Sequence, residues 1–211
     1  MALFITFEGI DRCGKTTQHR LLSGFFEEKG MPCYLTREPG GVPLAEKIRH
    51  ILLDPINEMR PMTELLLYMA SRYEHLHQLI LPKLQAGVHV LSDRFIDSSL
   101  VYQGVVRELG VERVRQLHQL TGIDRVPDQT FIIDIPPEVS EERIRQLNDR
   151  NRMECFSLSQ VTRLRDAYLM LAAENPGRFN LINGQQPIEI IQQEIRRILE
   201  EQAGLAEKKQ G

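Results

Sequence analysis

The sequence predicts an α/β fold in which a five-stranded parallel sheet carries helices on both faces. Short apolar, β-branched runs alternate with longer runs that have the spacing of helices. Strands separated by helices imply βαβ units, and βαβ units build parallel sheets. A glycine-rich loop also follows the first strand directly, at the edge where such sheets bind ligands.

The first half of the chain supplies three of the five strands. Residues 3–7, apolar except for Thr6, are expected to form the first strand. Residues 16–29 are expected to form a helix with Leu21, Leu22, Phe25 and Phe26 on one stripe and Gly30 as its stop. Residues 33–36 form a short second strand. Helices over 44–53 and 62–85 then lead to a third strand over 88–92.

The second half continues the same alternation. A helix begins near residue 98 and another covers 112–120, before a fourth strand over 130–135 that Pro136 and Pro137 end. Helices over 141–147 and 158–173 precede a fifth strand over 179–182. The last helix covers 187–200, and its apolar stripe consists of Ile188, Ile191, Ile195, Ile198 and Leu199.

Length and pattern favour one domain. The chain has 211 residues, no internal repeat and no long linker, so we expect residues 1–211 to form a single domain. The arginine-rich stretch 143–152 breaks the apolar pattern. We expect a short mobile lid around residues 143–157.

Charge and cysteine usage exclude several classes of protein. Lys and Arg total 26 against 29 Asp and Glu, so an overall basic field for duplex nucleic acid is absent. Three cysteines without a C-x-x-C pair suggest neither a disulfide framework nor a zinc site. The first residues lack the pattern of a signal peptide, and no apolar run approaches the roughly 18 residues of a membrane span. We therefore expect a soluble cytoplasmic protein with no membrane or nucleic-acid partner.

The loop after the first strand carries the decisive motif. Residues 9–16 read GIDRCGKT and match G-x-x-x-x-G-K-[ST] between a strand and a helix, the context that the motif requires. Backbone N–H groups of such a loop surround phosphate oxygens, the lysine adds a charge, and the hydroxyl can ligate Mg²⁺. The sequence therefore predicts a P-loop NTPase fold. We expect ATP to be bound by Gly9, Ile10, Asp11, Arg12, Cys13, Gly14, Lys15, Thr16 and Thr17.

The end of the third strand indicates the reaction. Motor and clamp-loading ATPases usually have an apolar strand that ends in Asp-Glu, whereas here an acid and a base, Asp93 and Arg94, follow Ser92. This pair suits a small-molecule kinase, with Asp93 near Mg²⁺ or water and Arg94 on an acceptor anion. Taken alone, the pair could equally be a solvated strand end with a surface ion pair. Thr16 and Asp93 are the expected metal ligands.

Four segments in one order resemble the thymidylate kinases. They are residues 7–18, 36–41 with Ile48 and Arg49, 68–72, and 92–99 with Tyr102, Gln103 and Gly104. The resemblance extends from Phe4 to about Leu199. It implies transfer of the γ-phosphoryl group of ATP to dTMP, giving dTDP, with Mg²⁺ and in a homodimer whose helices pack across a two-fold axis.

The resemblance also implies roles for individual residues. Asp11 would accept from the 3′-hydroxyl of the bound nucleotide and lie near the metal, although a loop Asp can also simply cap a helix. Tyr68 would stack on thymine, and Arg72, on the same helix face, would bond a base oxygen. From the helix alone, a core aromatic with a surface arginine is the simpler interpretation. The other acceptor-side residues implied are Glu38, Arg49 and Arg94 around the phosphate and sugar, and Ser99, Tyr102 and Gln103 around the base and deoxyribose.

Two segments contain candidates for the catalytic cation. Arg12 resembles the P-loop arginine of one branch of the family, which stabilises charge on the transferring group. Residues Arg143, Arg145, Arg150, Arg152 and Glu154 resemble the lid that closes over ATP. Asn151 stands where Asp is frequent before the Arg-x-Glu of that lid. This departure leaves open whether a lid arginine or Arg12 is the catalytic cation. The expected catalytic set is Lys15, Arg12, Asp93, Arg94 and Arg152.

Two other functions stay open on the sequence. Another nucleotide kinase is possible because thymine and uracil differ by one methyl group, which a pocket discriminates only about 10- to 200-fold. The second is an ATP-driven P-loop protein without metabolic catalysis. The acidic pI, the short chain and the missing Asp-Glu strand end argue against it.

Overall fold

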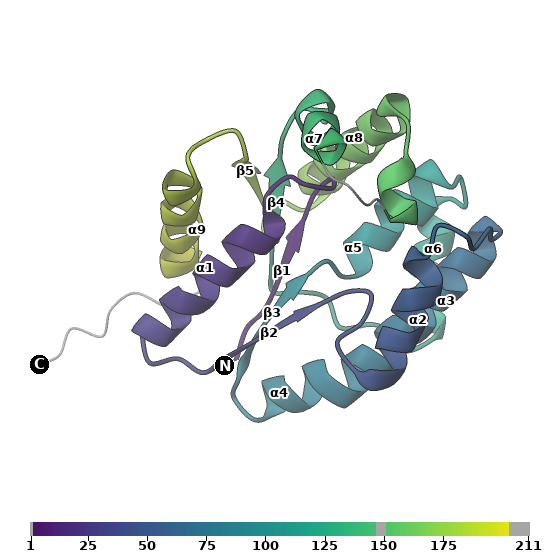
Figure 1. Cartoon of the computed structure of the whole chain (residues 1–211). Coiled ribbons are helices and arrows are strands. Elements are labelled where there is room, and N and C mark those ends of the chain that lie inside the picture. Colours follow the sequence, from purple (N-terminus) through teal and green to yellow (C-terminus); the bar gives the residue numbers. More distant parts are fainter. Residues whose placement is uncertain (1, 147–150, 203–211) are drawn as a thin grey trace, which may run out of the picture.

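The five strands form one parallel sheet in the order β2-β3-β1-β4-β5 (Figure 1). The computed structural model describes residues 2–146 and 151–202. All five predicted strands are present, and the fold class is confirmed. Their bounds differ from the predicted ones by a residue or two: β1 Phe4–Glu8, β2 Cys33–Arg37, β3 His89–Asp93, β4 Gln129–Asp134 and β5 Phe179–Asn183.

Helices cover both faces of the sheet, α1 and α9 on one side and most of the others on the opposite side (Figure 1). The α-helices are α1 Lys15–Glu28, α2 Pro43–Leu53, α3 Pro61–His75, α4 Leu81–Gln85, α5 Ile96–Ser99, α6 Val111–Leu120, α7 Pro137–Arg145, α8 Leu158–Glu174 and α9 Ile188–Gln202. Two π-helical stretches, η1 Leu76–Ile80 and η2 Leu100–Val106, and a 3₁₀ helix, η3 Arg152–Cys155, complete the elements of the described residues.

The core lies on the central strands. Every residue of β1 is buried, because helices cover both faces, as is usual for a parallel sheet. The ring of Phe7 packs against that of Phe131 on β4, with centroids 5.6 Å apart. On its other side β1 pairs in parallel with β3, with Phe4 opposite Val90. This rigid centre fixes the carboxyl ends of β1 and β3, from which the P-loop and Arg94 emerge.

Two predicted helices contain a change of pitch. The run predicted over 62–85 is helical throughout, but π-helix η1 separates α3 from α4. Pro82 lies just beyond η1, and proline lacks the N–H that the regular pattern requires. The helix predicted near residue 98 begins as α5 and continues as η2, where Tyr102 and Gln103 lie. Hydrophobic spacing alone does not reveal such changes.

The predicted lid region is described only in part. Helix α7 ends at Arg145, and η3 begins at Arg152 after a capping box formed by Asn151 and Glu154. Residues 147–150, with Arg150, lie outside the described residues. No helix in the described part of the chain is long and apolar enough to cross a membrane.

Candidate active site

The glycine-rich loop lies between β1 and α1 in the conformation that its motif predicts. Gly9 has φ 133°, and a Cβ there would lie 2.6 Å from the carbonyl oxygen of Ile133, so only glycine fits. Gly14, with φ 108°, is the N-cap of α1. The loop therefore leads into the positive end of a 14-residue helix, which is an anion-binding arrangement.

Lys15 holds its charge inside this loop. Its side chain is buried, and Nζ donates to the carbonyl oxygens of Ile10 at 2.8 Å and Gly9 at 3.2 Å. The Sγ atom of Cys13 lies 3.6 Å from the same nitrogen. The ammonium is thus fixed at the mouth of the loop, where it faces any phosphate that the loop binds.

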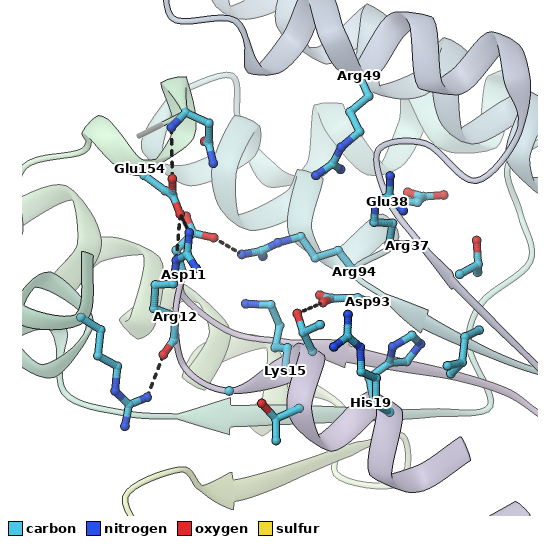
Figure 2. A pocket seen from close by; sticks show the side chains of 18 residues that line it. Asp11, Arg12, Lys15, His19, Arg37, Glu38, Arg49, Asp93, Arg94 and Glu154 are labelled. Carbon is cyan, nitrogen blue, oxygen red and sulfur yellow. Dashed lines mark hydrogen bonds and ion pairs between the residues drawn. The ribbon is translucent and has the colours of Figure 1, made fainter. Parts of the chain in front are cut away.

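A cavity of about 760 Å³ opens above the loop (Figure 2). Figure 2 shows Arg49 reaching into it from α2, while Lys15 and Arg94 reach in from the side of the sheet. The predicted residues among its lining are Asp11, Arg12, Gly14, Lys15, Thr16, Thr17, Glu38, Arg49, Asp93 and Arg94. Gly9, Ile10 and Cys13 belong to the same loop behind this surface.

A second cavity, of about 110 Å³, shares part of this lining. It brings together eight of the nine residues expected on the acceptor side: Asp11, Glu38, Arg49, Tyr68, Arg94, Ser99, Tyr102 and Gln103. The two cavities have five lining residues in common: Asp11, Glu38, Arg49, Arg94 and Asn151. A donor at the loop and an acceptor in the smaller cavity would therefore meet at these five side chains.

Arg72 is the acceptor-side residue that does not line this cavity. It is buried among side chains, with Nε donating to Glu38 at 2.6 Å and Nη1 donating to Ser99 at 2.9 Å. Nη1 also donates to Nε2 of His118 at 2.7 Å, and Nδ1 of that ring donates to the Val114 carbonyl. Burial and the neighbouring Arg72 lower the pKa of His118 to about 4, so the ring is neutral and accepts. In this structure Arg72 orients Glu38 and Ser99.

Thr16 and Asp93 lie side by side at the loop. The Thr16 hydroxyl donates to Oδ2 of Asp93 at 2.7 Å, and both residues line the larger cavity. The described residues contain no cluster of three or more His, Cys, Asp or Glu that could hold a metal by itself. One hydroxyl and one carboxylate fit Mg²⁺, which prefers oxygen ligands and completes its shell with phosphate and water.

Arg94 is the centre of the charged network. Its Nη2 donates to Asp11 at 2.7 Å and to the hydroxyl of Tyr102 at 3.1 Å. The negative charge of Asp11 inside the P-loop is therefore offset by the positive charge of Arg94. This ion pair reduces the repulsion between Asp11 and a bound phosphate. Arg94 has φ 74°, a left-handed conformation uncommon for a residue with a side chain. Such strain is typical of functional positions.

A buried group behind Arg94 holds it in place, and sequence reasoning missed it. Arg94 Nη1 donates to the hydroxyls of Ser98 at 3.0 Å and Tyr168 at 3.1 Å. Both hydroxyls donate in turn to Oε2 of Glu8, at 2.6 Å and 2.9 Å. Burial and the nearby Asp97 raise the pKa of Glu8 to about 7, against the opposing effect of Arg94. The sequence could have indicated Glu8, because it is a carboxylate at the end of a mostly apolar strand. No local pattern in the sequence distinguishes Tyr168 from other helix residues.

The described part of the predicted lid region contacts the loop through Arg12. Nε and Nη2 of Arg12 donate to Oε1 of Glu154 at 2.9 Å and 2.7 Å, and the side chain remains 43% exposed. Arg143 donates to the Arg12 carbonyl at 2.7 Å and lines the larger cavity. Arg145 pairs instead with Glu141 on the surface. Arg152 lines neither cavity, because it binds Glu64 at 2.6 Å.

These features define a class of protein. A phosphate-binding loop with its lysine, a Thr–Asp pair fit for Mg²⁺ and an arginine-lined acceptor cavity form the site of a P-loop kinase that phosphorylates a small molecule. The chain belongs to the thymidylate kinase family, whose model, described as Thymidylate kinase, matches residues 7–195. The family consists of ATP-dependent nucleoside monophosphate kinases.

Individual relatives agree over nearly the whole chain. The thymidylate kinase of Symbiobacterium thermophilum is 44% identical over 203 residues, covering 95% of this chain and 94% of that protein. That of Caldanaerobacter subterraneus subsp. tengcongensis is 43% identical over 198 residues, covering 94% and 95%. The crystal structure of thymidylate kinase from Ehrlichia chaffeensis has a TM-score of 0.76 at 35% identity, covering 94% of this chain and 98% of that one. The predicted family and fold are confirmed.

Proposed function

We propose that this protein transfers the γ-phosphoryl group of ATP to dTMP, giving dTDP and ADP for dTTP synthesis. The observation that carries the proposal is the junction of the two cavities at Arg94 and Asp11. A triphosphate on the loop and a monophosphate in the smaller cavity would have their reacting groups on either side of Arg94. Family membership supplies the identities of donor and acceptor.

Alignment and charge stabilisation account for the chemistry. The acceptor is a phosphate with a second pKa near 6, so it is mostly dianionic at neutral pH and needs no strong general base. Lys15, Arg12 and Arg94 stabilise the charge on the transferring group, and Arg143 reaches the same cavity from α7. Thr16 and Asp93 would hold Mg²⁺, which neutralises charge on the donor phosphates when bound.

The smaller cavity supplies the selectivity for the acceptor. Tyr68 from α3 would stack on the base, and Gln103 and Ser99 would face its polar edge. The Tyr102 hydroxyl lies 3.4 Å from Asp11 Oδ2. A ribose 2′-hydroxyl would crowd Tyr102, so we propose that the site prefers deoxyribonucleotides.

An acceptor panel tests this function. In a coupled ADP-release assay with Mg-ATP, we expect dTMP to be the best acceptor among dTMP, dUMP, UMP, CMP, AMP, GMP and thymidine. We expect dUMP to be slower by about 10- to 200-fold, because the missing methyl group forfeits contact in the pocket. Thymidine should be inactive, since it offers no phosphate to Arg49 and Arg94.

The same assay separates the competing functions. Preference for another monophosphate would retain the kinase class but discard the roles of Tyr68 and Tyr102. ATP hydrolysis stimulated by DNA and by no monophosphate would instead support a motor protein. Excess EDTA should abolish transfer and added Mg²⁺ should restore it, which checks that the reaction requires a divalent cation.

We also propose a homodimer, a single kinase domain over residues 1–211 with its lid at 143–157, and a cytoplasmic location. The three free thiols suit a reducing compartment.

Exposed apolar side chains support the dimer: Leu44 and Ile51 lie seven residues apart on α2, and Leu66 and Tyr73 lie seven apart on α3. The two helices pack side by side (Figure 1), and their apolar stripes would pair across a two-fold axis.

Sedimentation tests the dimer. We expect the wild-type chain to sediment as a dimer at micromolar concentration and Leu66→Glu to sediment as a monomer, because a charge would then lie in the apolar contact. Met170→Glu is the matched control, since Met170 is 66% exposed but lies on α8. A wild-type monomer, or a Leu66→Glu dimer as stable as the control, would refute the arrangement.

A further inference from the structure

Glu64 on α3 is a buried carboxylate that the reaction chemistry does not use. Its side chain is 1% exposed, and it lies one helical turn before Tyr68. Oε1 accepts from Gln103 Nε2 at 2.8 Å and from Arg107 Nε at 3.3 Å. Oε2 accepts from Arg107 Nη2 at 3.1 Å and from Arg152 Nη1 at 2.6 Å. The hydrogen bonds from these three residues outweigh burial and lower the pKa of Glu64, so it stays charged.

The three partners come from different elements around the smaller, acceptor cavity. Gln103 lies in η2 and lines that cavity, and Arg107 directly follows η2. Arg152 begins η3, and its neighbours Asn151 and Met153 line the cavity from the lid side. The carboxylate therefore joins the α3 wall, the η2 wall and the lid at one point.

Arg152 is committed to this place by a second contact. Its Nε donates to the carbonyl oxygen of Leu52 at the end of α2, at 2.8 Å. Its Nη2 is buried and has no hydrogen-bond partner among the described residues. The contacts with Glu64 and Leu52 are therefore the ones that hold the guanidinium in place. Beside it, Phe156 packs under the Arg107 guanidinium, 5.0 Å from the ring centroid.

We propose that Glu64 is a positioning residue that latches the lid, through Arg152, over the acceptor cavity. The latch couples acceptor binding to lid closure, because Asn151 and Met153 form part of the cavity only while η3 is held against α2 and α3. Arg152 thus acts on the acceptor side, and the phosphates are left to Arg12 and Arg143. The inference rests on the proposed function for the identity of the acceptor.

A double-mutant cycle between Glu64→Gln and Arg152→Met tests the latch. We expect each variant to raise the KM for dTMP about 10-fold, with kcat and the KM for ATP changing less than about 3-fold. The double variant should be no worse than either single one, because both remove the same contact. Arg115→Met is the matched control: it removes an exposed ion pair between α6 and Glu174 of α8, outside both cavities, and should match wild type.

Hydrogen exchange of residues 151–157 provides a readout that needs no turnover. We expect exchange there to accelerate in Glu64→Gln and Arg152→Met, and added dTMP to restore less protection than in wild type. Folded variants with wild-type KM for dTMP and wild-type exchange would overturn the latch. A large loss of kcat in Arg152→Met at unchanged KM for dTMP would also overturn it, since it would place Arg152 on the phosphates.

The two proposals fail in different ways. If wild-type protein does not phosphorylate dTMP, the proposed function falls, while the exchange experiment without nucleotide still tests the latch. If Glu64→Gln does not fold, Arg152→Met alone tests the latch. The Arg152 side chain is 12% exposed against 1% for Glu64, so its replacement disturbs the core less.

Discussion

Arg94→Ala is expected to lower kcat/KM for dTMP by about 10³-fold or more, equivalent to about 4 kcal/mol of transition-state stabilisation. The reason is that Arg94 lies where the larger cavity, proposed for the donor, joins the smaller cavity, proposed for the acceptor. There its guanidinium would align a dianionic phosphate through two parallel hydrogen bonds. Without Arg94 the carboxylate of Asp11 would also lose its 2.7 Å partner and repel the incoming phosphates. Steady-state kinetics with varied dTMP measure the loss.

Two controls make the Arg94 result specific. Far-UV circular dichroism and thermal melting must show that the variant folds, because Arg94 also contacts the buried Tyr168 hydroxyl. Arg94→Lys keeps the charge but loses the planar fork, so we expect only a partial recovery of kcat/KM. Near-normal turnover by folded Arg94→Ala would remove Arg94 from the mechanism.

Lys15→Ala is expected to cause a loss of similar size, about 10²- to 10³-fold, expressed mainly in kcat. The Lys15 ammonium is buried in the P-loop and already oriented by the carbonyl oxygens of Gly9 and Ile10. Its charge therefore needs no rearrangement to stabilise the outer phosphates in the transition state. Single-turnover kinetics at saturating ATP and dTMP separate this effect from weaker nucleotide binding.

A graded variant and a binding measurement control the Lys15 experiment. Lys15→Arg retains a cation but not a compact one, so it should stay well below wild type. Direct titration with dTMP should change little in Lys15→Ala, because Lys15 does not line the acceptor cavity. A wild-type single-turnover rate in Lys15→Ala would contradict the assignment of the P-loop as the donor site.

The catalytic cations show where sequence reasoning reached its limit. Arg12 and Arg152 both suited that role by resemblance, and the departure at Asn151 left the choice open. In the structure Arg12 borders the donor cavity and Arg152 binds Glu64, 88 positions away in sequence. No local pattern links two residues so far apart, since their contact depends on how α3 and η3 meet.

The sequence alone determined the features that depend on local chemistry. Apolar runs that alternate with helical segments predicted the five strands and the parallel sheet. Residues 9–16 predicted the phosphate-binding loop, because their glycine, lysine and threonine spacing between a strand and a helix is specific to such loops. The order of four short segments predicted the family. It also predicted eight residues that line the acceptor cavity.

Only the tertiary structure decided which groups converge behind those residues. Glu8, Ser98 and Tyr168 come from β1, α5 and α8, and they meet only because the sheet brings the ends of β1 and β3 under helix α8. The same is true of Arg72, which lies behind the cavity wall instead of in it. Buried polar groups must find partners wherever the packing puts them, and packing is a property of the whole chain.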